Sequence, residues 1–277
     1  MFERSLHLLF IAGCIWSQLA YAADTDHGRV AVHSGDRAQA RQRAGICDIR
    51  CIYQKRVGAL IPDASGAIAY LKPDKPEPSA LFGASVSLSG DGSKLAVGDE
   101  NSGEVYLFTE NGTHQLDIGF RFEKIVELSR DGRTLAAGAP GDVSGGRGVK
   151  SDIENGEAMF SGAVWVFLVS DGRMKRQAYI KASNADAEDG FGEAVALSAD
   201  GDTLAVGAPW EAGGAGTGGD ESDNSADSAG AVYIFRREGG SWRQQAYVKA
   251  ADVVEHACFG YSVALSDDGG TLAVGAF

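Results

Sequence analysis

Short apolar runs separated by turn residues recur along this chain, and the clearest example lies between residues 191 and 209 (FGEAVALSADGDTLAVGAP). The runs are apolar at successive positions, as in strands that are buried on both faces. Asp200 and Gly201 between them predict a tight hairpin, because this pair favours positive backbone dihedrals. A third apolar run and a fourth, more polar run of edge character follow. The pattern predicts four antiparallel strands, at residues 194–197, 204–207, 231–235 and 242–249.

The same unit recurs elsewhere in the chain. A second apolar segment follows the first three copies and reads GEVYLF, GAVWVF and GAVYIF. An Ala-Tyr-x-Lys segment begins thirteen residues before the phenylalanine of three copies, at Ala69, Ala178 and Ala246. Self-similarity at such spacing indicates a repeat architecture. The other copies of the first segment begin at Phe82, Phe122 and Phe259.

Units of four strands, with small residues in the first strand and aromatic residues in the third, favour blades that narrow toward an axis and stack radially. We therefore predict an all-β fold, a β-propeller of four-stranded antiparallel blades. The alternative is a β-sandwich of unrelated hairpins, which does not require a repeated four-strand unit.

The Phe-Gly start, the Gly-Ala-Pro end and the Gly-Ala-Val-Tyr strand resemble FG-GAP repeats, as in the propeller of integrin α-chains and in secreted bacterial proteins. The resemblance covers residues 66–277 and is most specific over residues 191–249. Glu123 replaces the glycine of the second copy, and Asp99-Glu100 replace Ala-Pro in the first. These departures predict an irregular second blade. The resemblance implies a non-catalytic binding or adhesion module that presents rim loops to a protein or glycan.

The first 22 residues resemble a secretory signal peptide. Arg4 supplies a positive charge, an apolar run follows, and Ala20-Tyr21-Ala22 is a small-x-small cleavage site. Cleavage after Ala22 predicts a secreted, periplasmic or cell-surface protein, and retention of the apolar run as an anchor is the alternative. We expect a leader segment over residues 23–65 and the propeller over residues 66–277.

The last copy begins at Phe259 and stops at Phe277, after its second strand. About three and a half blades are therefore expected, whereas closed rings have roughly 4 to 8. Residues 66–72 are a candidate outer strand for the last blade. One interpretation is a truncated product or a structural repeat fragment of a longer extracellular protein. The other is that two chains complement each other, and either predicts self-association through an open propeller edge.

The formal net charge of −13 argues against nucleic acids and anionic membranes as partners, because both carry the same sign. We therefore expect the partner to be a protein or carbohydrate ligand outside the cytoplasm. Asn111-Gly112-Thr113 is an acceptor sequence for N-glycosylation, which would make the chain a glycoprotein, or simply a turn between two strands.

Two cysteines precede the repeats. Cys47 and Cys51 are candidates for a local disulfide in an oxidising compartment, with two free thiols as the alternative. Cys258 is expected to be a small buried apolar residue.

Calcium is the one cofactor that the resemblance suggests. Integrin-type repeats hold it through several aspartates in the first hairpin, an arrangement close to an EF-hand loop. Each hairpin here offers one carboxylate, so we expect turn residues at Asp91, Asp131, Asp200 and Asp268. The long loop at residues 210–229 contains five acids and no lysine or arginine. It is either a flexible solvated loop or a calcium site with the candidate ligands Asp220, Asp223 and Asp227.

No catalytic constellation is evident. The histidines are scattered, and no Gly-x-Ser-x-Gly, His-Glu-x-x-His or phosphate-binding glycine loop occurs. We predict that the protein is not an enzyme. The competing hypothesis, an active site at the propeller axis, would need ionisable residues on the innermost strands, where only Glu127 stands out.

Overall fold

The structure is a computed structural model that describes residue 71 and residues 81–100, 103–118, 125–150, 158–214, 216–218 and 220–277. Apart from Leu71, these residues belong to one compact unit that contains Lys72–Phe277. The cleavage site after Ala22, the leader segment, the pair Cys47 and Cys51 and the candidate closing strand at residues 66–72 lie outside the described residues.

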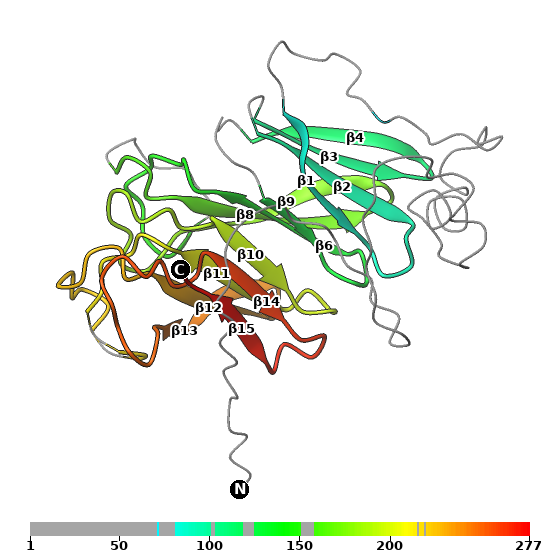
Figure 1. Ribbon diagram of the computed structural model, residues 1–277. Coiled ribbons are helices and arrows are strands. Elements are labelled where there is room, and N and C mark those ends of the chain that lie inside the picture. Colours follow the sequence, from blue (N-terminus) through cyan, green and yellow to red (C-terminus); the bar gives the residue numbers. More distant parts are fainter. Residues whose placement is uncertain are drawn as a thin grey trace, which may run out of the picture. The chain divides into compact units, whose positions relative to one another are not determined.

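The described residues form strands and no helix (Figure 1), and no candidate membrane-spanning helix is therefore found among them. The strands are β1 (Phe82–Leu88), β2 (Lys94–Asp99), β3 (Glu104–Thr109), β4 (Gly112–Asp117), β5 (Ile125–Leu128), β6 (Thr134–Ala139), β7 (Val149–Lys150), β8 (Ala163–Ser170), β9 (Arg173–Ile180), β10 (Ala194–Leu197), β11 (Thr203–Ala208), β12 (Ala231–Glu238), β13 (Ser241–Val248), β14 (Ser262–Leu265) and β15 (Leu272–Gly275).

The strands pair in chain order into antiparallel sheets, which confirms the predicted four-strand unit. The sheets are β1-β2-β3-β4, β5-β6-β8-β9 with β7 added at the edge, β10-β11-β12-β13, and the pair β14-β15. The first strands of successive sheets contact one another, β1 with β5, β5 with β10 and β10 with β14. Innermost first strands and outermost fourth strands are the arrangement of propeller blades. The described strands do not close into a ring, as expected.

The first two strands of the second blade pair in regular register. β5 pairs with β6 from Ile125 opposite Gly138 through Leu128 opposite Leu135 without a register shift. The register of these two strands is set by their hydrophobic pattern and by the geometry of the turn at Asp131. Glu123 itself lies outside the described residues.

Glycines explain why the Phe-Gly and Gly-Ala-Pro segments recur. At the joint between the second and third blades, a Cβ atom on Gly138 would overlap the carbonyl oxygen of Gly192, and one on Gly162 would overlap that of Phe191. Gly162 and Phe191 also form a parallel bridge between the blades. Only glycine permits so close a backbone approach. The next joint repeats these contacts with Gly207, Gly230, Phe259 and Gly260.

The hairpin turns are wider than predicted. Ser198 accepts a hydrogen bond at its side chain from the Thr203 amide (2.9 Å) and donates one to Asp200 (2.6 Å), which in turn accepts from the Asp202 amide (3.0 Å). Gly201 has φ = 70°, whereas Asp200 is not in the left-handed region. A serine and an aspartate therefore build a four-residue loop in place of a two-residue turn. Asp91, Asp131 and Asp268 repeat the serine contact at 2.6 Å, so all four aspartates are turn residues.

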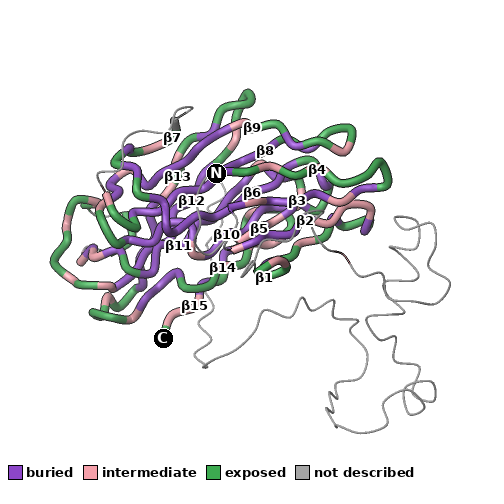
Figure 2. Tube along the Cα trace, turned by 90° about the horizontal axis from the view of Figure 1, so that it is seen from above, coloured by how far each residue is buried: buried purple, intermediate pink, exposed green. Residues whose placement is uncertain are grey.

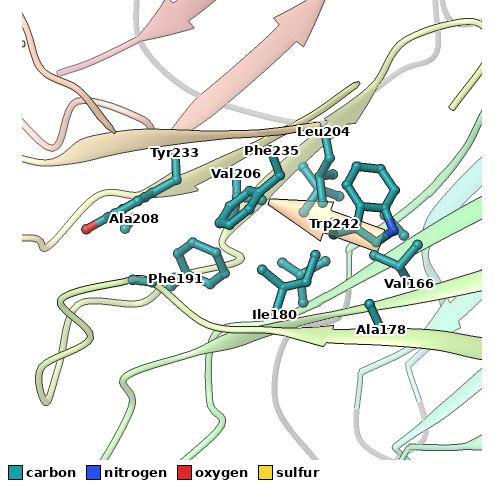
Figure 3. Close-up of a cluster of buried hydrophobic side chains, with 14 of the residues drawn as sticks. Val166, Ala178, Ile180, Phe191, Leu204, Val206, Ala208, Tyr233, Phe235 and Trp242 are labelled. Carbon is teal, nitrogen blue, oxygen red and sulfur yellow. The ribbon is translucent and has the colours of Figure 1, made fainter. Parts of the chain in front are cut away.

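The core lies between blades, and Figure 2 shows the buried residues concentrated in the strands. Between the second and third blades, Phe191 packs edge-on against Tyr233, with ring centres 5.3 Å apart, and Trp242 lies near Val166 and Ile180 (Figure 3). Each sheet is therefore apolar on both faces, as the unbroken apolar runs predict. Cys258 is buried, as expected.

Candidate functional site

Two long loops connect the second and third strands of their blades, at residues 140–162 and 209–230, and both lie at the end of the sheets away from the hairpin turns. In Figure 1 the loop of the third blade (yellow to orange) lies opposite the β10–β11 and β14–β15 turns. Each loop passes along the outermost strand of its blade. Val149 of β7 pairs with Ile180, and Thr217 bonds to both backbone groups of Lys249 (2.8 and 2.9 Å). The loops are thus held to the blade edges.

A buried polar cluster anchors the loop of the second blade. Asp142 follows β6 in the loop, and Tyr179 and Lys181 come from the end of β9. Tyr179 donates to Asp142 (2.8 Å), and the Lys181 ammonium lies 3.6 Å from the same carboxylate. Lys181 also donates to the Ser161 hydroxyl (2.6 Å) and the Ser144 carbonyl oxygen (2.7 Å). Burial lowers the pKa of Lys181, while Asp142 acts in the opposite direction. The buried ammonium therefore has two hydrogen-bond acceptors and a counter-ion.

The third blade repeats this cluster with changed partners. Glu211 takes the place of Asp142, and Tyr247 and Lys249 come from the end of β13. Glu211 accepts hydrogen bonds from Asn184 (3.0 Å) and Tyr247 (3.3 Å), and Tyr233 lies 3.2 Å from its other oxygen. All of these side chains are buried. The loop is therefore anchored here too, through a glutamate in place of an aspartate.

Lys249 differs from Lys181 because its buried ammonium has no hydrogen-bond partner. Ser161, whose hydroxyl accepts from Lys181, is replaced by Ala229 in the third blade, and Ser144, which accepts through its carbonyl oxygen, is replaced by Gly213. A Cβ atom on Gly213 would overlap the Tyr247 hydroxyl and lie 3.3 Å from the Lys249 nitrogen. Burial lowers the pKa of Lys249 to about 8, against the opposing effect of Glu211.

Two carboxyl groups share the polar cluster of the third blade. Burial raises the pKa of Asp189 to about 8, and the adjacent Glu211 adds to this rise. Burial also raises the pKa of Glu211, although Lys249 counteracts it. Two neighbouring buried carboxylates cannot both be charged without a large electrostatic penalty. At neutral pH the pair therefore holds a proton.

The candidate calcium ligands are spread along the loop of the third blade. Asp220 accepts from the Ser222 amide (2.9 Å), and Asp223 accepts from the Ser225 amide (3.0 Å). Asp227 accepts from Ser228 and lies 3.9 Å from His256. Among the described residues, no three acidic, histidine or cysteine side chains are grouped as a metal site requires. Calcium binding by this loop stays a prediction.

Glu127 lies on the inner strand β5 and faces the first blade. The Ser87 hydroxyl donates to it (3.3 Å), and burial raises the pKa of Glu127 to about 7. Among the described inner strands it is the one ionisable side chain. The structure therefore brings no second titratable group of these strands to the axis.

Exposed apolar side chains gather where the loops of the second and third blades meet. Met159, Phe160 and Trp210, here called the rim patch, are 61%, 41% and 39% exposed. The Glu188 amide donates to the Met159 carbonyl oxygen (2.7 Å), the Gly190 amide donates to that of Phe160 (2.9 Å), and the Trp210 ring covers Gly190. All three residues are thus gathered at one short segment.

The backbone at this rim adopts unfavourable conformations. Phe160 and Glu188 have φ values of 55° and 72°, and Ser228 and His256 repeat them in the next blade at 49° and 61°. A non-glycine residue in the left-handed region carries strain of about 1 kcal/mol or more, and such residues cluster at functional sites. Equivalent residues of the two blades have these strained conformations, so the strain is a feature of the repeat and not of one loop.

Sequence reasoning noted the Ala-Tyr-x-Lys segments but assigned them no role. The missing signal was the acid that lies two residues after the proline of two copies, at Asp142 and Glu211. The acid lies at the same distance from the proline in both copies, and this regularity could have indicated that it contacts the tyrosine and the lysine. Nothing local in the sequence indicates that the three side chains meet.

Comparisons with known proteins agree with the repeat. Residues 174–235 and 242–277 match the family described as FG-GAP repeat. A search of curated proteins finds no match. Among solved structures, the β-propeller domain of Myceliophteria thermophila Cps50 (Swd1) is 13% identical with a TM-score of 0.45, covering 71% of this chain and 52% of that one. Kuenenia stuttgartiensis hydrazine synthase is 15% identical with a TM-score of 0.43, covering 74% and 44%.

This chain therefore spans about half or less of the length of these two structures, and likeness at that level does not extend to function. The family match covers the third blade, its preceding strand and the β14–β15 pair. The same strand order occurs in the first and second blades, and the same glycine joint links the second and third blades. On this basis residues 174–235 and 242–277 match FG-GAP repeats, and the described blades have the fold of a β-propeller.

Proposed function

We propose that this protein is an exported, non-catalytic binding module whose protein or glycan ligand contacts the rim formed by the two long loops. The observation that carries the proposal is the combination of anchored loops with an exposed rim patch. Buried tyrosine, lysine and carboxylate groups hold the loops, while Met159, Phe160 and Trp210 face the solvent.

Anchoring supports a binding role because an ordered loop loses less conformational entropy when a ligand binds. Glu221 contributes to this order in the third blade, since it accepts hydrogen bonds from Gln244 (2.9 Å) and from the hydroxyl of Ser183. Exposed aromatic side chains on such a frame are typical anchors of binding surfaces. Export is consistent with the signal-like residues 1–22 and with the extracellular setting typical of FG-GAP repeats.

The second candidate is an enzyme with its site at the axis, and the raised pKa of Glu127 is the observation that favours it. A carboxyl group that titrates near neutrality is suited to general acid–base chemistry. The lack of a second titratable side chain on the described inner strands favours the binding role.

The test compares the full chain with Trp210→Ala on a glycan array and against a panel of extracellular proteins by biolayer interferometry. The matched control is Leu168→Ala, because Leu168 is also 39% exposed but lies in β8 outside the rim. We expect Trp210→Ala to weaken binding by about tenfold or more and Leu168→Ala to leave it unchanged. Equal effects of the two substitutions, or no binding by the full chain, would contradict the proposal.

A further inference from the structure

The rim segments of the second, third and fourth blades differ in charge from the rest of the surface. Residues 183–190, 210–229 and 251–258 contain ten aspartates and glutamates and no lysine or arginine, and the loop at residues 140–162 adds four acids together with Arg147 and Lys150. The hairpin turns and the strand ends next to them, at the other end of the sheets, contain both signs, with Arg130, Arg133, Arg173, Lys175, Arg176, Arg236, Arg237 and Arg243 among the acids. Charge is therefore segregated along the strand direction.

Half of these ten carboxylates are exposed to the solvent. Asp189 and Glu211 are buried in the polar cluster of the third blade, and Asp186 is paired with Arg147 of the neighbouring loop (2.9 Å). Glu221 is bonded to the edge of the blade. The fully exposed acids are Glu188, Asp220, Asp227, Asp252 and Glu255. These five create a negative field that extends beyond the surface.

The rim patch lies within this acidic rim. Glu188 is bonded through its amide to Met159, and the backbone amide of Trp210 donates to the carbonyl oxygen of Asp189 (3.3 Å). Phe160 is held in a left-handed conformation beside them. In a surface of this kind apolar contacts supply affinity and the net charge of the surrounding segments supplies the choice of partner.

We propose that this rim binds a basic polypeptide segment, with lysine or arginine side chains against the exposed carboxylates and an apolar side chain against Trp210 and Phe160. The inference rests on the proposed function and specifies the ligand class of the same surface. Anionic glycans and nucleic acids are repelled by the same charges. A neutral saccharide would contact Trp210 but would gain nothing from the net negative charge.

The test uses a short synthetic peptide of lysines around one phenylalanine, and a control peptide with glutamine in place of each lysine. Isothermal titration with the full chain is run at low salt and at about 0.5 M salt, where charges are screened within a few ångströms. We expect binding of the lysine peptide only, weakened about tenfold or more by salt and by Trp210→Ala.

A pair of charge variants separates a specific rim from general acidity. Glu188→Gln with Asp227→Asn removes two rim charges, and Asp171→Asn with Glu238→Gln removes two exposed charges from the hairpin turns. The first pair of substitutions should weaken binding of the lysine peptide several-fold more than the second pair does. Equal effects of the two pairs, or equal binding of the lysine and glutamine peptides, would overturn the inference.

The glycan array separates the two proposals. Glycan binding that depends on Trp210, without binding of the lysine peptide, would overturn the basic-peptide inference and leave the rim as the binding surface. Loss of both kinds of binding would overturn both.

Discussion

Single residues decide how firmly each long loop is held. Lys181 and Lys249 occupy equivalent positions and are almost completely buried, yet only Lys181 has acceptors for its ammonium hydrogens. A buried charge is tolerated when it is paired and hydrogen-bonded, and it is destabilising when it is not. The two blades therefore carry the same cluster with different energetic consequences.

Replacing each lysine with methionine tests this difference. Lys181→Met removes a satisfied charge and leaves Asp142 buried without its counter-ion, so the free energy of unfolding should fall by about 3 kcal/mol or more. Lys249→Met removes an ammonium that has no hydrogen-bond partner, so the loss should be much smaller. Chemical denaturation of both variants measures the difference, and equal losses would show that the two clusters are equivalent.

Ala229→Ser should stabilise the polar cluster of the third blade. The new hydroxyl would occupy the position of Ser161, which accepts from Lys181 at 2.6 Å. A hydrogen bond to a charged group contributes about 1.5 kcal/mol or more, so thermal and chemical unfolding should both shift upward. Ser161→Ala is the reverse change and should destabilise the second blade. A stability below that of the natural chain in Ala229→Ser would show that Lys249 is already satisfied.

At the scale of elements, neighbouring blades meet through backbone contacts that exclude side chains. Gly138 and Gly207 each lie against the glycine that follows the phenylalanine of the next blade. The apolar strands on either side then pack into one continuous core. This close approach explains why the repeat is marked by glycines as well as by apolar residues.

Gly207→Ala should therefore be severely destabilising, because its Cβ atom would overlap the carbonyl oxygen of Gly260. Gly239→Ala is the control, since Gly239 has a positive φ of 57° but no atom within contact distance of a Cβ. We expect a loss of about 1 kcal/mol for the control and a several-fold larger loss for Gly207→Ala. Circular dichroism melts measure both, and similar losses would contradict the tight joint.

At the scale of the whole molecule, buried titratable groups predict an unusual dependence of stability on pH. The pKa of Glu127 is raised from 4.5 to about 7, and that of Asp189 from 3.8 to about 8. The folded state then binds more protons than the unfolded state in these windows, so stability falls as the pH rises. The pKa of Lys249 is lowered from 10.5 to about 8, so this group adds stability as the pH rises from 8 to 10.5.

We therefore expect these three groups to give a stability minimum near pH 8. Glu127→Gln should remove the part of the fall between pH 4.5 and pH 7, at most about 3 kcal/mol at about 1.4 kcal/mol per pKa unit. Denaturation midpoints of both proteins measured across this range provide the comparison. Parallel curves for the two proteins would show that Glu127 does not titrate differently on folding.

The sequence by itself determined the four-strand unit, its turns and its repetition. The apolar runs at Ala194–Leu197 and Thr203–Ala208 needed only local pattern, because a strand buried on both faces must be apolar throughout. The turn aspartates were likewise predictable, although the serine that completes each turn was not foreseen. The effect of Glu123 on the second blade stays a prediction, because Glu123 lies outside the described residues.

Only the tertiary structure decided where the chemistry lies. Asp142 and Tyr179 are 37 residues apart in the chain and meet because a long loop returns along the blade edge. The unpartnered Lys249 depends on Ala229, which has no hydroxyl where Ser161 accepts a hydrogen bond from Lys181, and which gives no signal of its own. The rim patch likewise combines residues of two blades. The local pattern of apolar residues predicts strands because the burial of a strand is visible in successive residues. The polar clusters and the rim patch arise from contacts between segments that are distant in the sequence, and the local pattern does not connect these segments.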